Sequence, residues 1–201
     1  MNMSEIKAFT RWDIDGIKID DPGLKDYITV KPQIVPRSGA RYAGSRFHKS
    51  KVFIVERLMN KIMVAGHKSK KHNKSSGHCT GKGHKVYDIM EAALTIVEER
   101  IKENPIKVLV KAIENAAQRE EITTIEYGGA RYPKVVECAP QRRVDLVLRH
   151  LAQGAYTRSF KKKRDIASCL AEEIILAYKA SPDSHAISKK LDVERQADSS
   201  R

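Results

Sequence analysis

The sequence predicts a mainly α-helical fold: a bundle of five to six helices with one long protruding β-hairpin and a basic N-terminal extension. Apolar residues recur every three or four positions in successive segments, which is typical of amphipathic helices. One stretch at about 122–138 instead has two β-rich runs on either side of a Gly-Gly pair. The chain has 201 residues, of which 41% are hydrophobic, so it can bury the core of one domain. No apolar run approaches the ~18 residues that span a bilayer.

The N-terminal part is predicted to differ from the rest. Residues 1–30 are acidic and contain Asp21-Pro22-Gly23, so we expect an arm that ends in a turn. Residues 31–50 combine prolines, glycines and basic residues, which favours an extended basic segment. We therefore divide the chain into residues 1–50, an arm and basic segment, and residues 51–201, a helical domain that carries the hairpin at about 122–138.

Three helices are expected before the hairpin. The first begins near Lys51 and ends before Gly66, a candidate C-cap. Residues 67–85 are rich in Gly, Ser, Lys and His and predict a loop. A second helix is expected over 86–102, and Asn104-Pro105 predicts the N-cap and first residue of a third.

The hairpin is predicted over 122–138, because paired glycines supply the positive φ angles that a tight turn requires. Pro133 cannot donate a hydrogen bond, which indicates a ribbon with free edges. After it, Pro140 predicts a helix to about residue 155, and Ile166, Leu170, Ile174 and Tyr178 mark the inner face of another. The C-terminal tail shows a weak apolar stripe and predicts a loosely packed helix.

The charge is concentrated in two blocks. The chain has a formal net charge of +13; residues 31–85 contain fourteen Lys and Arg against Glu56, and residues 131–164 contain ten against Glu137 and Asp145. Charge of this density is costly unless a polyanion neutralises it. The expected partner is nucleic acid. The three cysteines are far apart and odd in number, which favours a reducing, intracellular location over a disulfide framework.

Catalysis and metal binding are poorly supported. His72, His78, Cys79 and His84 offer four ligands in one loop, but their spacing lacks the paired geometry of zinc sites. No nucleophile elbow, Walker loop or HExxH motif is present. We expect neither an enzyme nor a cofactor. Phosphate contact is the favoured role of the loop, through the following lysines: Lys68, Lys70, Lys71, Lys74, Lys82 and Lys85.

The hairpin and the helix after it are further candidate contacts. Tyr and Arg or Lys on a projecting ribbon can stack on bases and bind phosphates. The hairpin set is Tyr127, Gly128, Gly129, Arg131, Tyr132 and Lys134. Arg142 and Arg143 lie at a predicted helix N-terminus, where free backbone amides also bind phosphate. Arg142, Arg143 and Arg149 are all expected on the outer face of that helix.

Several segments, in order, resemble the small-subunit ribosomal protein seven family in its archaeal or eukaryotic form. They are RSGARYAGSRFHKSKVFIVERLMNKIMVAGHKSKK, the His-rich loop, YGGARYP, CAPQRRVDLVLRHLAQGA and IASCLAEEIILAYKASPDSHAISKKLDVERQADS. The resemblance implies a cytoplasmic protein of the small subunit that binds the 3′ major domain of its rRNA and nucleates assembly of the head. It also implies other head proteins as partners, and a hairpin near exit-site tRNA and mRNA.

By this resemblance, the RNA-binding basic segment corresponds to Arg37, Arg41, Arg46, Lys49 and Lys51. The loop corresponds to Lys68 through Lys85, the hairpin tip to Gly128 and Gly129, and the following helix to Arg142 and Arg143. Bacterial members place basic residues before the glycines, whereas Glu126-Tyr127 stand there in this chain. Two alternatives remain open: a dimeric helical DNA-binding architectural or regulatory protein, and a metal-dependent nuclease that uses the His/Cys loop.

Overall fold

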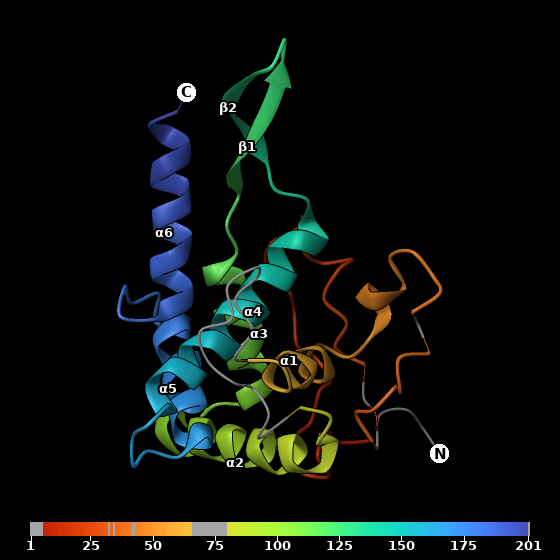
Figure 1. The fold of residues 1–201 in the computed structure, drawn as a ribbon. Coiled ribbons are helices and arrows are strands. Elements are labelled where there is room, and N and C mark those ends of the chain that lie inside the picture. Colours follow the sequence, from red (N-terminus) through yellow and green to blue (C-terminus); the bar gives the residue numbers. More distant parts are fainter. Residues whose placement is uncertain (1–5, 32, 34, 42, 66–79, 201) are drawn as a thin grey trace.

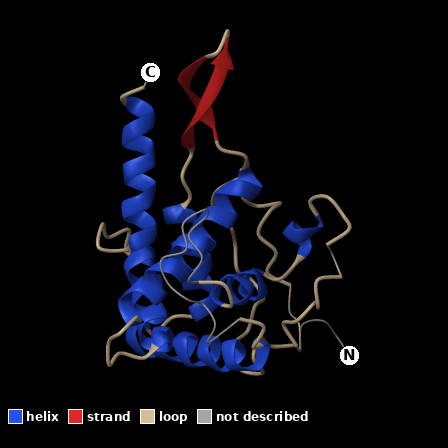
Figure 2. Cartoon of the chain, in the orientation of Figure 1, coloured by secondary structure: helices blue, strands red, loops and turns tan. Residues whose placement is uncertain are grey.

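The computed structural model describes residues 6–65, apart from 32, 34 and 42, and residues 80–200. Within these residues the chain forms six α-helices and one two-stranded antiparallel hairpin, which confirms the predicted fold class (Figures 1 and 2). The helices are α1 (Ile54–Ile62), α2 (Gly83–Ile101), α3 (Pro105–Ala116), α4 (Pro140–Ser159), α5 (Ile166–Tyr178) and α6 (His185–Asp198). The strands are β1 (Glu120–Tyr127) and β2 (Ala130–Glu137).

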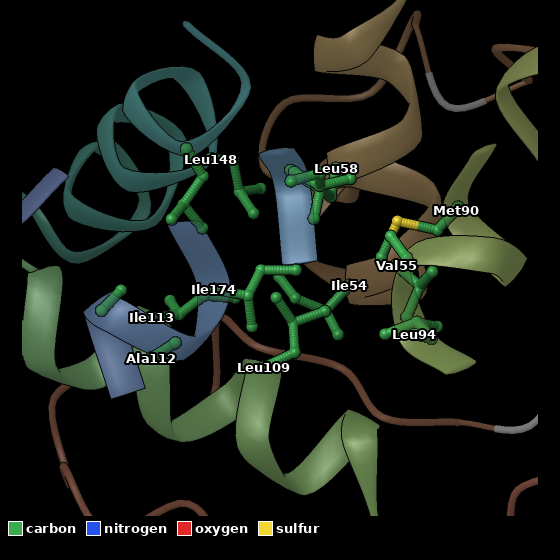
Figure 3. Close-up of a cluster of buried hydrophobic side chains, with 14 of the residues drawn as sticks. Ile54, Val55, Leu58, Met90, Leu94, Leu109, Ala112, Ile113, Leu148 and Ile174 are labelled. Atoms are coloured by element: carbon green, nitrogen blue, oxygen red, sulfur yellow. The ribbon is translucent and has the colours of Figure 1, made fainter. Parts of the chain in front are cut away.

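Helix α5 is the centre of the bundle. Side chains around most of its circumference are buried, including Leu170 and Ile174, and it contacts α2, α3 and α4. A helix that is apolar on all sides is stable only inside a core. Figure 3 shows Ile174 among buried side chains of α1 to α4, such as Leu58, Leu109 and Leu148. Helices α2, α3 and α4 therefore surround α5.

Local sequence signals place several helix starts. The Asn104 side chain accepts a hydrogen bond from the Ile106 amide at 3.0 Å, with Pro105 in the first turn, as predicted. The first helix starts later than expected, at Ile54, because a 3₁₀ turn over His48–Lys51 precedes it and the Ile54 amide donates to the Thr29 carbonyl. Helix α4 continues to Ser159, and Gly66 lies outside the described residues.

Residues 6–30 pack into the core rather than extending as a free arm. Phe9, Trp12 and Leu24 are buried, and the Trp12 indole donates to Glu98 of α2 at 2.9 Å. The predicted turn is present, since the Gly23 amide donates to the Asp21 carboxylate at 2.8 Å. The Phe9 ring lies 5.7 Å from that of Trp12 within the segment and 4.7 Å from that of Tyr87 of α2, so the segment packs both on itself and on the bundle.

The hairpin projects away from the bundle, beside α6 (Figure 1). Gly128 and Gly129 both have positive φ angles, 59° and 81°, as a two-residue turn of this handedness requires. Pro133 lies opposite Thr124 in a sheet that has only two strands, so its missing amide costs no interior hydrogen bond. Helix α6 is well packed at its start, where Ser184 and Ile187 are buried, and exposed at Leu191.

Gly154 explains how α4, α5 and α6 approach closely. A Cβ atom at this position would lie 2.9 Å from Glu173 Cδ and 2.9 Å from His185 Cβ. We expect Gly154→Ala to lower the free energy of unfolding by about 1–3 kcal/mol, although alanine is the better helix former, because three helices must move apart. Urea unfolding measures this. Gly44→Ala is the control, since nothing lies within 4 Å of its Cβ position; equal stability of the two variants would contradict the packing argument.

Candidate nucleic-acid interface

The basic segment is fixed to the helical body by two carboxylates, one buried and one half-buried. Glu56 of α1, 3% exposed, accepts hydrogen bonds from the Ser38 amide at 2.7 Å and from the Ser38 hydroxyl at 2.5 Å. Lys49 forms an ion pair with Asp145 of α4. The cations of residues 37–51 are therefore presented on a rigid support, which reduces the entropy that would be lost on binding a partner.

Asp145 joins the basic segment, α1 and α4 in one network. Besides Lys49, its carboxylate accepts from the Arg57 guanidinium at 3.1 Å, and Arg57, 3% exposed, also donates to the Tyr27 carbonyl at 2.8 Å. Burial by itself would raise the pKa of Asp145. The hydrogen bond from Lys49 and the charge of Arg57 outweigh burial, so the pKa lies below its ordinary value. The carboxylate is thus ionised and acts as an internal counter-ion.

Lys61 belongs to the same cluster, although it was not among the residues predicted from the sequence. Its pKa is lowered, first by burial and then by the positive charges of Lys49, Arg149 and Arg57, against the raising effect of Asp145. We call Lys49, Arg57, Lys61, Asp145 and Arg149 the Asp145 cluster. The cluster contains four basic side chains and one carboxylate, so it carries excess positive charge where α1 packs on α4. An anion such as a phosphate would relieve that imbalance.

A signal for Lys61 was present in the sequence. Arg57 and Lys61 are four residues apart on α1, and Asp145 and Arg149 are four apart on α4. Residues at this spacing share one face of a helix. Two such pairs on helices that pack together would have indicated the cluster, had the pairing of α1 with α4 been known.

Most of the predicted rRNA contacts are at the surface. Those that the structure shows as exposed are Arg37, Arg41, Arg46, Lys51, Lys82, Lys85, Arg142 and Arg149, while Lys49 is half-buried. Arg46 stacks on the exposed Phe47 ring, 5.0 Å from its centroid. Lys68, Lys70, Lys71 and Lys74 lie outside the described residues. The exposed set leaves ample cationic surface for a polyanion around the Asp145 cluster and the start of α2.

The prediction that Arg143 lies on the outer face of α4 is wrong. It is 9% exposed and donates to the Gln118 carbonyl and to the Asp21 carboxylate, both at 2.9 Å. The first turn of α4 faces both the chain before the hairpin and the N-terminal segment, so the side chain bridges them. Arg142 is exposed but pairs with Glu121 of β1 at 2.7 Å. These two arginines hold the base of the hairpin.

The strand register divides the hairpin into two faces. Tyr132 lies opposite Ile125, Lys134 opposite Thr123, and Tyr127 opposite Ala130, so both tyrosines and Lys134 share a face. Tyr127 is 82% exposed and Tyr132 58%. Arg131 lies opposite Glu126 on the other face and pairs with it at 3.4 Å. One face is therefore aromatic and cationic, and the other carries a neutralised charge pair.

The described residues carry no group of three His, Cys, Asp or Glu side chains placed to hold a metal ion. His84 is described and lies at the start of α2, whereas His72, His78 and Cys79 fall outside the described residues. No described helix is both long enough and apolar enough to cross a membrane. The chemistry that the described surface offers is the binding of anions and of flat aromatic groups.

Comparisons with known proteins agree with these features. The family model described as ribosomal protein S7p/S5e matches residues 24–201. The small ribosomal subunit protein uS7 of Nanoarchaeum equitans is 53% identical over 197 residues, covering 98% of this chain and all of the relative. The protein of the same name from Archaeoglobus fulgidus is 45% identical over 197 residues, covering 98% of this chain and 96% of the relative.

Proposed function

The chain belongs to the ribosomal protein S7p/S5e family, and we propose that it binds the 3′ major domain of small-subunit rRNA and nucleates assembly of the subunit head. Membership of the family gives it a structural role in the ribosome. Its relatives carry the name of a small-subunit protein, so rRNA and neighbouring small-subunit proteins are its partners. In this proposal the protein acts by binding RNA and does not catalyse a reaction.

The Asp145 cluster is the observation that carries this proposal. It places cations from the basic segment, α1 and α4 around a single carboxylate, and the lowered pKa of Lys61, caused by burial and by neighbouring cations, indicates a local excess of positive charge. Because the three elements pack together, phosphates bound to them are fixed relative to one another. A rigid cationic platform of this kind supports the joining of several RNA helices at a junction.

Protection footprinting of small-subunit rRNA with the purified protein tests the proposal. We expect a compact footprint on the 3′ major domain that survives competition by heparin at physiological ionic strength. Contacts to phosphates position a protein, and shape complementarity supplies preference for a folded RNA over an unstructured polyanion. A diffuse footprint, or complete displacement by heparin, would contradict it.

We propose in addition that the aromatic face of the hairpin lies near exit-site tRNA and mRNA. Replacing Tyr127 and Tyr132 together by serine should leave rRNA affinity nearly unchanged, because both residues are far out on the ribbon. Crosslinking of exit-site tRNA to reconstituted subunits should fall several-fold, since stacking on a base contributes ~1–3 kcal/mol. Arg131→Ala, on the opposite face, is the matched control. Loss of primary rRNA binding in the tyrosine variant would show that the ribbon is assigned wrongly.

A further inference from the structure

A cavity of about 510 Å³ lies where the C-terminal end of α4 meets the N-terminal ends of α2 and α5. Its volume is in the range of small-molecule pockets, about 300–1,000 Å³. Ile62 of α1, Ile89 of α2 and Ile166 of α5 contribute apolar side chains to its wall. None of the contacts described above for the Asp145 cluster or the hairpin involves this cavity, so it is a separate feature of the molecule.

Two aromatic rings form one side of the cavity. Tyr156 and Phe160 are four residues apart at the end of α4, their centroids lie 5.5 Å from each other, and their planes are inclined by 35°. Both residues are half-buried, so part of each ring remains accessible. An accessible aromatic wall above an apolar floor suits a flat ring system, because a base can stack there without needing a hydrogen-bond partner inside.

The rim of the cavity is cationic. Lys85, Lys161 and Arg164 line it, and Lys161 Nζ lies 5.8 Å from the Phe160 centroid. Asp165 also lines it, but its carboxylate accepts from the Ala167 amide at 3.3 Å as the N-cap of α5. Arg164 pairs with Glu172 at 3.1 Å. Helix α2 begins without a side-chain cap, so its first amides add positive potential close to Lys85.

We propose that this cavity binds one unstacked nucleotide of rRNA, with its base against Tyr156 and Phe160 and its flanking phosphates at Lys85 and Lys161. The inference rests on the proposed rRNA binding and names a specific subsite for it. An apolar aromatic wall alone would also suit a hydrophobic peptide, but the cationic rim has no complement in such a ligand. A nucleotide carries both groups that the cavity would bind, a flat ring and an anion.

Affinity and its salt dependence, measured for a 3′ major domain fragment, test the subsite. Phe160→Leu keeps an apolar side chain but removes the stacking surface, so we expect binding to weaken about 5-fold or more while the salt slope stays unchanged. Phe160→Tyr should bind as the wild type does. Lys161→Ala should instead make the slope shallower by roughly 0.7–0.9 log unit, as expected for one lost phosphate contact. Thermal unfolding of each variant establishes that the fold is kept.

Crosslinking supplies an independent readout. With 4-thiouridine placed at unpaired positions of the fragment, we expect a crosslink to the peptide that contains Tyr156 and Phe160. If the wild type binds the fragment but Phe160→Leu binds equally well and that crosslink is absent, the subsite is overturned and the proposed function stands. If the wild type does not bind the fragment, both the subsite and the proposed rRNA binding are overturned. Displacement of the fragment by free AMP in excess would point to a mononucleotide as the ligand and would also overturn the subsite.

Discussion

Asp145→Ala is expected to lower the free energy of unfolding by about 3–5 kcal/mol. The substitution removes the carboxylate that pairs with the buried Arg57 and with Lys49. Taking one partner from a buried pair costs this much because the remaining charge is not compensated. Here the effect is strengthened by the mutual repulsion of Lys61 and Arg57, which the carboxylate no longer offsets. Urea unfolding at neutral pH measures the loss.

Asp192→Ala is the matched control for this prediction. Asp192 also pairs with a lysine, Lys189, at 3.2 Å on α6, but both side chains are more than 40% exposed. Exposed pairs contribute ~0–1 kcal/mol. If the two substitutions destabilise the protein equally, Asp145 is an ordinary surface acid and the network we describe does not hold α1, α4 and the basic segment together.

The pH dependence of stability provides a second check on Asp145. Its pKa in the folded protein is lowered below the ordinary 3.8, so the unfolded chain binds a proton more readily than the folded one. The stabilisation is therefore complete above the unfolded pKa and is lost as pH falls through the folded pKa. Between pH 5 and pH 2 (about the window in which such a carboxylate titrates) the wild type should lose more stability than Asp145→Ala.

The helices and hairpin could be predicted because their signals are local. Asn104-Pro105 specifies a helix start through hydrogen bonds within three residues, and Gly128-Gly129 specifies a turn through two φ angles. In the same way, the apolar spacing of Ile166, Leu170 and Ile174 identifies the inner face of α5. None of these inferences requires knowledge of which elements pack together.

The packing of the N-terminal segment and the position of Arg143 could not be predicted in this way. Phe9 and Trp12 are buried because Tyr87 and Glu98 of α2 meet them, and those contacts span more than seventy residues. Arg143 has the sequence context of an exposed helix start. It is buried because Gln118 and Asp21, both remote along the chain, converge on it. A basic residue in a basic block can equally be a structural bridge or a ligand contact.

The candidate interface was predicted in composition but not in arrangement. The two basic blocks identified a polyanion-binding protein correctly at the level of the family. The cluster that joins them depends on α1 packing against α4, which brings Lys61 of the first block to Arg149 of the second. The net charge of a block can be counted along the sequence. The arrangement of those charges on a binding surface depends on which helices pack together, and that requires the structure.

Replacing Lys61 and Arg149 together by alanine should weaken binding to the 3′ major domain about 100-fold without loss of stability. Each cation contributes roughly a factor of ten if it makes one charge-assisted phosphate contact, and the salt slope should become shallower by roughly 1.4–1.8 log units for two lost contacts. Stability should hold because the folded state already disfavours the charge of Lys61, whose pKa is lowered by burial and by its cationic neighbours.

Arg100→Ala combined with Lys107→Ala removes the same charge from the exposed surfaces of α2 and α3 and is the control. Both residues lie within residues 86–130, where Asp and Glu outnumber Lys and Arg. That variant should bind with nearly the affinity and salt slope of the wild type, because long-range attraction falls off within a Debye length of ~8 Å at physiological salt. Equal weakening of both double variants would mean that net charge, and not the arrangement of cations around Asp145, determines affinity. The function would then require no fixed platform, and the rigid attachment of the basic segment through Glu56 and Asp145 would have only a structural purpose.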